Sequence, residues 1–211
     1  MTSSSATPGR PALEIRPYRA ADRAAVYDVC VRTGAAGADA RGLLSTDDLI
    51  PDIYAGPYLE LEPQHAFVLD NGERAVGYVI GTASTPGFVA AYQRDWLPKL
   101  RIRYAPPEGE PATEEERKLA DMFHPERMLR PELAPYPAHL HIDLLPEAQR
   151  GGHGRVMVET FLASVAAAGA PSCHLTVRPS NLGALQFYAK TGWQRIEVPD
   201  PGNWVVLVRS I

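Results

Sequence analysis

The sequence predicts a domain of the α/β class, because strand-like and helix-like runs follow one another along a single chain. Short runs in which apolar residues alternate with polar ones recur between residues 13 and 208. Runs with apolar residues at i, i+3 and i+4 lie between them. One strand-like run also passes through a glycine-rich turn into a helix-like run. With 211 residues and 45% hydrophobic composition, we expect one domain over residues 13–211 with a sizeable core.

The first predicted elements are a short strand at residues 13–17 and a helix from about Ala21. Val26, Val29 and Cys30 follow the helical period, so Cys30 is expected to be a core thiol, and Gly34 is a plausible end of the helix. A second helical piece is expected after Thr46.

A β-hairpin is predicted next. Two β-rich runs, at about 65–69 and 75–83, flank the turn-forming tripeptide Asp70-Asn71-Gly72.

Residues 86–137 are predicted to form an insertion. They hold nine of the twenty prolines together with several aromatic residues, which argues against plain disorder. Thr113 followed by Glu116 predicts a capping box at a helix start. The insertion either covers the substrate or packs over a sheet edge and blocks edge-to-edge association, and both roles are compatible.

Composition excludes several classes of function. A net charge of -4 and scattered basic residues predict no nucleic-acid partner. No run of 18 or more apolar residues exists, so no membrane association is expected. Residues 1–12 are small and polar and are predicted to be a disordered tail. Two cysteines are too few for a disulfide framework, which favours a reducing, cytoplasmic setting.

The strand that begins at His139 carries the first candidate chemistry. Its two-residue period places His139, His141 and Asp143 on one face. These three residues are candidate ligands of a catalytic metal, which would make the protein a metal-dependent hydrolase. Asp143 is alternatively a general base beside the glycine loop. The third interpretation is a solvated or hydrogen-bonded strand face without chemistry.

The glycine loop after this strand predicts an anion site. The segment Gln149-Arg150-Gly151-Gly152-His153-Gly154 lies between a strand and a helix that carries Val158, Phe161, Leu162 and Val165. Backbone N–H groups at such a helix start point in one direction, with the positive end of the helix dipole behind them. Glycines let a phosphate approach the backbone. The loop has neither the third small residue of a dinucleotide fingerprint nor the Lys-Ser/Thr of a P-loop.

Two motifs resemble the GNAT (GCN5-related N-acetyltransferase) superfamily. Gln149, Gly152 and Gly154 match its Q/R-x-x-G-x-G/A loop. After a further strand at 174–177, the segment from Asn181 to Trp193 is similar to the superfamily's N-x-x-A-x-x-F-Y-x-K-x-G-F element. More narrowly, the segment Tyr136–Asp143 and the tripeptide Val177-Arg178-Pro179 resemble the acetyltransferase-like C-terminal domain of O-GlcNAc hydrolases and its free-standing bacterial relatives. That branch includes domains of doubtful acetyltransferase activity.

The resemblance implies a GNAT fold, in which a mixed, mostly antiparallel sheet carries helices on both faces and is splayed where acetyl-CoA binds. Acetyl-CoA is then the cosubstrate, and no metal is expected. The backbone of Leu144 and Leu145 would pair with the pantetheine arm, and N–H groups from Arg150 to Arg155 would hold the pyrophosphate. The cofactor-binding residues expected on this basis are Leu144, Leu145, Gln149, Arg150, Gly151, Gly152, His153, Gly154, Arg155, Asn181 and Tyr188.

The implied reaction is transfer of the acetyl group to an amine by direct attack on the thioester. Tyr188 matches the position of the acid that protonates the departing thiolate. Asp143 is the first choice for the base, with His141 and Glu147 behind it. The acceptor is a small-molecule amine or a protein lysine. The main rival is an acetyl-CoA-binding module without catalysis. The final strand, at 204–208, is compatible with a monomer or a homodimer.

Overall fold

The computed structural model describes residues 12–199 and 202–211, so most of the expected N-terminal tail lies outside the described residues. One seven-stranded sheet organises the fold, with strand order β1-β2-β3-β4-β5-β7-β6. All neighbouring strands are antiparallel except β4 and β5, which are parallel. The strands are β1 (Glu14–Pro17), β2 (Phe67–Asp70), β3 (Ala75–Thr82), β4 (Ala138–Leu144), β5 (Ser172–Val177), β6 (Gln194–Ile196) and β7 (Val205–Ser210).

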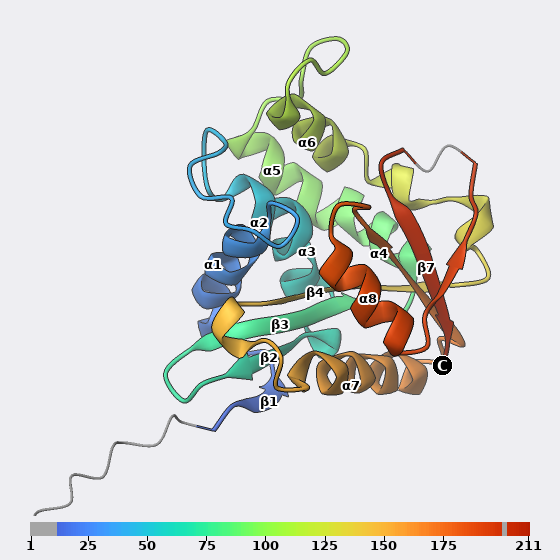
Figure 1. The fold of residues 1–211 in the computed structure, drawn as a ribbon. Coiled ribbons are helices and arrows are strands. Elements are labelled where there is room, and N and C mark those ends of the chain that lie inside the picture. The colour runs from blue at the N-terminus through green and yellow to red at the C-terminus, as the bar shows by residue number, and fades with distance from the viewer. Residues whose placement is uncertain (1–11, 200–201) are drawn as a thin grey trace, which may run out of the picture.

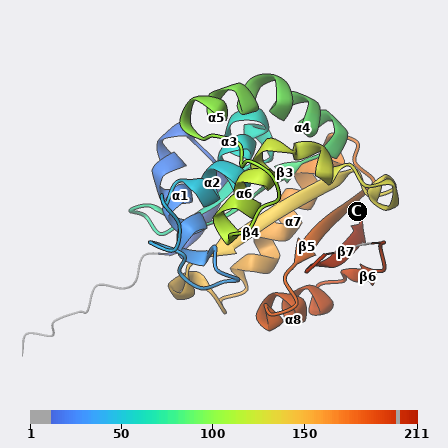
Figure 2. The same ribbon diagram turned by 90° about the horizontal axis from the view of Figure 1, so that it is seen from above.

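Helices cover both faces of this sheet. In Figure 1, α7 lies below the strands and α1, α2 and α3 lie above them. Figure 2 shows the same arrangement from above, with α8 beside β5, β6 and β7. The helices are α1 (Arg23–Thr33), α2 (Leu49–Tyr54), α3 (Gly56–Leu61), α4 (Thr85–Ala91), α5 (Leu97–Arg103), α6 (Glu114–Phe123), α7 (His153–Ala167) and α8 (Leu182–Lys190). A π-helical turn at Tyr92–Trp96 joins α4 to α5. Short 3-10 turns lie at Ala20–Asp22, Pro63–His65, Pro125–Met128, Pro131–Leu133 and Pro146–Ala148.

The α/β class and most predicted elements are confirmed. Cys30 is buried in the core, Gly34 caps the end of α1, and the hairpin is formed by β2 and β3. His65 was expected in a strand but ends a 3-10 turn. The Thr113 capping box is present: the Thr113 hydroxyl accepts from the N–H of Glu116 at 3.1 Å, and the Glu116 carboxylate accepts from the N–H of Thr113 at 2.9 Å. Four of the helices and strands were not predicted, namely α3, α4, α5 and β6.

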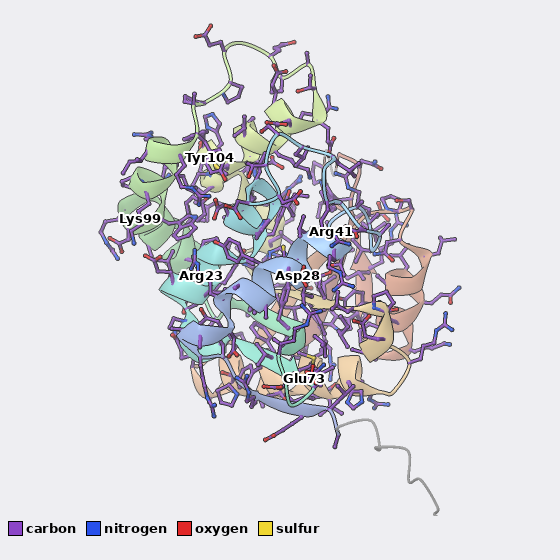
Figure 3. All side chains as sticks on the ribbon, turned by 90° about the vertical axis from the view of Figure 1, so that its left-hand side faces the viewer. Arg23, Asp28, Arg41, Glu73, Lys99 and Tyr104 are labelled. Atoms are coloured by element: carbon purple, nitrogen blue, oxygen red, sulfur yellow. The ribbon has the colours of Figure 1, made fainter. Side chains whose placement is uncertain are left out.

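The outer face of α1 is charged, as expected for a helix that covers a sheet on one side only. Arg23 and Asp28 lie on this face in Figure 3. Asp28 forms ion pairs with Arg32 at 3.3 Å and with Arg74 at 2.7 Å. In the described part of the chain, no helix is long and apolar enough to cross a membrane.

The packing of β3 between its neighbours leaves no space at Gly81. A Cβ atom there would overlap the carbonyl oxygen of His139 and lie 2.6 Å from Cζ of Phe161 on α7. We therefore expect Gly81→Ala to lower the free energy of unfolding by about 3 kcal/mol, because neither the strand nor the buried ring has room to move.

The matched control for this substitution is Gly183→Ala in α8, where the nearest atom to a new Cβ is 3.8 Å away. This change should alter stability by less than about 1 kcal/mol. Urea unfolding of both variants measures the difference, and equal midpoints would contradict the packing argument.

Candidate functional site

The site lies where β4 and β5 separate. These parallel strands pair only at Ala138 with Cys173 and at His139 with His174. Beyond those two pairs β4 stays with β3 as far as Leu144, while β5 stays with β7. Figure 2 shows the two halves of the sheet diverging from this point. Among the described residues, no strand therefore lies on the β5 side of the remainder of β4, as the predicted splayed sheet requires.

The open edge of β4 offers backbone groups, but fewer than expected. Leu145 donates its N–H to the Val76 carbonyl at 2.9 Å and accepts at its own carbonyl from Ala148 at 2.8 Å. Because backbone groups of an antiparallel strand alternate in direction, those of Ile142 and Leu144 face the gap. The prediction that Leu145 shares the pairing is wrong, since both its backbone groups are already used.

Gln149 braces the glycine loop against the strand. Its side-chain amide donates to the carbonyl of Leu144 at 2.8 Å. The residue is solvent-exposed, and this bond ties the loop to the end of β4. This contact is structural, and the cofactor contact of Gln149 stays a prediction.

The loop itself turns sharply into α7. Arg150 and Gly152 both have left-handed backbone, with φ of 66° and 81°, and Gly152 caps the helix start. The N–H groups of Arg155 and Val156 bond to the Gly152 carbonyl. Those of Gly152, His153 and Gly154 have no acceptor among the described residues. Three N–H groups are thus free for the predicted anion, a narrower span than predicted, because the N–H of Arg155 is already bonded to the Gly152 carbonyl.

Two exposed arginines flank this cradle. Neither Arg150 nor Arg155 forms an ion pair with a described residue that would hold its charge elsewhere. Both guanidinium groups are therefore available to an anion at the start of α7.

Asp143 is held on β4 by a hydrogen bond from the opposite strand. The Tyr78 hydroxyl donates to its carboxylate at 2.6 Å. Burial raises the pKa of Asp143 to about 6, while the hydrogen bonds from Tyr78 and Thr33 oppose that rise. A half-buried carboxylate that titrates near neutral pH is suited to accept a proton.

Tyr188 presents a free hydroxyl from α8. Asn181 starts this helix by accepting at its side-chain oxygen from the N–H of Ala184 at 3.0 Å, so its observed role is that of a cap. The Tyr188 ring is 6% exposed, and its hydroxyl has no partner in the described parts of the chain. Burial raises the pKa of Tyr188, and the negative charge of Asp143 raises it further, so the phenol stays protonated.

A hydrogen-bonded histidine cluster lies beside Asp143. His139 contacts the Tyr58 hydroxyl through Nε2 and the Thr85 hydroxyl through Nδ1, both at 2.7 Å. His141 contacts the same Tyr58 hydroxyl through Nε2 at 3.1 Å. Burial lowers the pKa of both rings, that of His141 to about 4, so both are neutral.

These contacts do not favour the metal-site alternative. Both nitrogens of His139 already have hydrogen-bond partners, and no group of three or more His, Cys, Asp or Glu residues within residues 12–199 and 202–211 is arranged to hold a metal ion.

Asp143, Tyr188 and His141 line one cavity of about 490 Å³. Aromatic rings of Tyr54, Phe88 and Tyr92 form part of its wall. The insertion contributes Lys118, Asp121, Pro125, Arg127, Met128, Arg130 and Leu133. The insertion therefore lines this cavity. The position of the insertion can be explained without the alternative that it covers an edge strand of the sheet, β1 or β6.

Three residues that shape the site were missed by sequence reasoning. Tyr58, Tyr78 and Thr85 lie 81, 65 and 54 residues from their hydrogen-bond partners on β4. Tyr78 alone had a signal, since the predicted hairpin places it on a strand next to the site.

A mixed sheet that splays between its two parallel strands, beside a glycine-rich helix start, agrees with the GNAT fold that the sequence motifs predict. Comparison with known proteins agrees with this class. The model of the acetyltransferase (GNAT) family matches residues 43–193. The chain belongs to the GNAT acetyltransferase family.

Individual relatives support the narrower resemblance as well. The chain is 31% identical to rat protein O-GlcNAcase (Rattus norvegicus) over 97% of its own length, but it spans only 23% of that protein. The crystal structure of SsHAT is 48% identical, with a TM-score of 0.90 over 95% of this chain and 98% of that one. The yncA structure from Salmonella typhimurium, a putative acetyltransferase with its cofactor acetyl-CoA, is 14% identical, with a TM-score of 0.54 over 94% and 93% of the two chains, and shows the shared fold.

Proposed function

We propose that this protein is an acetyl-CoA-dependent N-acetyltransferase that acts on an amine of a small molecule or of a protein lysine. The observation that carries the proposal is the placement of Asp143 and Tyr188 on one cavity at the point where β4 and β5 separate. The end of a molecule bound between β4 and β5 would lie close to the side chains of Asp143 and Tyr188. The acetyl-CoA bound in the yncA structure supports the choice of cosubstrate.

The cosubstrate would be held by the chain's own backbone. The backbone of Ile142 and the N–H of Leu144, whose carbonyl already accepts from Gln149, would pair with the pantetheine amides like an added strand. The N–H groups of Gly152, His153 and Gly154 would bind the pyrophosphate, with Arg150 and Arg155 as charged donors. His153 and Gly151 would contribute by keeping the loop conformation, since a Cβ at Gly151 would meet the His153 ring at 2.8 Å.

The chemistry divides between two side chains. Asp143 accepts a proton from the ammonium form of the acceptor and releases it to solvent. The nitrogen lone pair then attacks the thioester carbon, the C–N bond forms and the C–S bond breaks. Tyr188 gives its proton to the departing sulfur and recovers one from the nitrogen, so that an amide and a free thiol result.

The direct test is titration of acetyl-CoA into the purified protein by calorimetry, followed by an amine panel with product detection by mass spectrometry. Micromolar binding and acetylated product would support the proposal. Binding without product from any amine would leave a non-catalytic acetyl-CoA-binding module. No binding would overturn the cosubstrate assignment.

Tyr188→Phe separates binding from chemistry. We expect unchanged affinity for acetyl-CoA and a fall in kcat of about 10- to 100-fold, because only the proton donor is lost. The control is Tyr104→Phe (Figure 3), because Tyr104 does not line the cavity and its hydroxyl donates to the buried carboxylate of Asp52. A Tyr188→Phe variant with unaltered kcat would remove Tyr188 from the mechanism.

A further inference from the structure

The donor and the acceptor of each hydrogen bond around His139 can be assigned, starting from Thr85. The Thr85 hydroxyl donates to the Pro137 carbonyl at 2.9 Å, and a carbonyl can only accept. Having used its one proton there, the Thr85 oxygen accepts from Nδ1 of His139 at 2.7 Å. Neutral His139 therefore carries its proton on Nδ1 and offers a lone pair at Nε2.

The donors and acceptors of the hydrogen bonds from Tyr58 to His139 and His141 follow from this assignment. Tyr58 donates its hydroxyl proton to Nε2 of His139 at 2.7 Å. Its oxygen then accepts from Nε2 of His141 at 3.1 Å. Neutral His141 consequently carries its proton on Nε2, and its Nδ1 is an unprotonated acceptor. Nδ1 has no partner among the described residues, and the ring lines the cavity.

His141 and Asp143 lie two residues apart on the same face of β4, and both line the cavity. A strand rises about 3.3 Å per residue, so the two side chains start roughly 6.6 Å apart. Both side chains leave the strand on the same face, so a substrate nitrogen in the cavity between them can approach Nδ1 of His141 and the Asp143 carboxylate together.

We propose that Nδ1 of His141 is a fixed hydrogen-bond acceptor that, together with Asp143, holds the attacking nitrogen of the substrate and selects nitrogen over oxygen nucleophiles. Tyr58, His139 and Thr85 are positioning residues, because they act by fixing the tautomer of His141. This inference rests on the proposed acetyl transfer.

The proton itself goes to Asp143. Burial lowers the pKa of His141 to about 4 and raises that of Asp143 to about 6, so the carboxylate is the stronger base of the two. The role of His141 is then to accept a hydrogen bond from a hydrogen that stays on the nitrogen.

Counting hydrogens explains the selection. An ammonium group has three: Asp143 takes one, one replaces the proton that Tyr188 gave to sulfur, and the third remains in the amide and can bond to His141. An alcohol has a single hydrogen, which leaves when the ester forms. Its oxygen would then face the lone pair of His141 without a hydrogen bond, and a site built for such a bond discriminates against groups that lack it.

Nuclear magnetic resonance tests the tautomers without any substrate. In the ¹⁵N-labelled full chain at neutral pH, we expect His141 to be protonated on Nε2 alone and His139 on Nδ1 alone. Tyr58→Phe should convert His141 to a mixture of tautomers. The control Tyr54→Phe removes a hydroxyl from a ring 5.9 Å from that of His141, with no hydrogen bond between the two, and should leave the tautomers unchanged. A proton on Nδ1 of His141 in the wild type would overturn the proposal.

Two probes that differ only in the nucleophilic atom, butylamine and 1-butanol, test the selection on the protein loaded with coenzyme A, which carries no acetyl group to transfer. Butylamine at fixed pH should shift the Nδ1 signal of His141, and 1-butanol should not, because the single hydrogen of its hydroxyl group is donated to Asp143, the stronger base of the two. His141→Gln, which keeps a donor toward Tyr58 but has no acceptor at the Nδ1 position, should weaken butylamine binding about tenfold. Equal responses to both probes, or none to either, would overturn the role of His141. Calorimetric binding of acetyl-CoA would then still stand, so this failure is distinct from failure of the proposed function.

Discussion

Gly154→Trp is expected to abolish acetyl-CoA binding while the protein remains folded. Gly154 is the second residue of α7, and a Cβ atom there would lie 3.6 Å from Phe187 on α8 and 4.0 Å from Leu144 on β4. It therefore sits in the wall where the gap between the strands meets the helix start. An indole on this position would occupy the space that a pyrophosphate needs in order to reach the N–H groups of Gly152 and His153.

The matched control is Gly154→Ala. The contacts of its Cβ would be at ordinary van der Waals distance, and alanine suits a helix better than glycine does. We expect the alanine variant to bind acetyl-CoA within about tenfold of the wild type, whereas the tryptophan variant should show a loss of at least about 100-fold. Calorimetry measures both affinities, and circular dichroism confirms folding. Full binding by a folded Gly154→Trp variant would move the cofactor away from this loop.

The elements around the site were predictable because their signals are local. The alternation of β4 and the glycines before α7 each depend on residues within a few positions of one another. The two-residue period correctly placed His139, His141 and Asp143 on one face. Elements with weak local signals, such as β6 with three residues and α3 with six, were missed.

The partners of those side chains were not predictable in the same way. Whether His141 is a metal ligand, a base or a hydrogen-bond acceptor depends on Tyr58 and Thr85, which reach β4 only through the packing of α3 and α4 against the sheet. Similarly, Leu145 and Leu144 are neighbours in the sequence, yet only Leu144 faces the gap, because the hydrogen-bond register with β3 decides the direction of each backbone group.

Asp143→Asn is expected to lower turnover by at least about 100-fold, the contribution typical of a positioned general base. Asparagine keeps the shape of the side chain and can still accept the hydrogen bond from Tyr78, but it cannot take a proton. In the wild type, kcat at saturating acceptor should fall on the acid side with an apparent pKa near 6, the value to which burial raises the pKa of Asp143. This limb should be absent from the residual activity of the variant. The control Asp28→Asn changes a carboxylate on the outer face of α1 (Figure 3) and should retain the limb.

The same substitution should stabilise the fold above pH 6. The pKa of Asp143 is raised from 3.8 to about 6, so between these values the folded state binds more protons than the unfolded state, and stability falls as the pH rises through this window. Above pH 6 the wild type therefore carries a cost of about 3 kcal/mol that Asp143→Asn removes, whereas at pH 4 and below the two proteins should unfold alike. For a chain of this size, a cost of about 3 kcal/mol corresponds to a rise in Tm of roughly 6–12 °C at pH 8. Thermal unfolding of both proteins at pH 4 and pH 8 measures this difference. If the variant is inactive and also less stable than the wild type at pH 8, Asp143 is a carboxylate that stabilises the fold. It is then not a general base whose burial lowers stability.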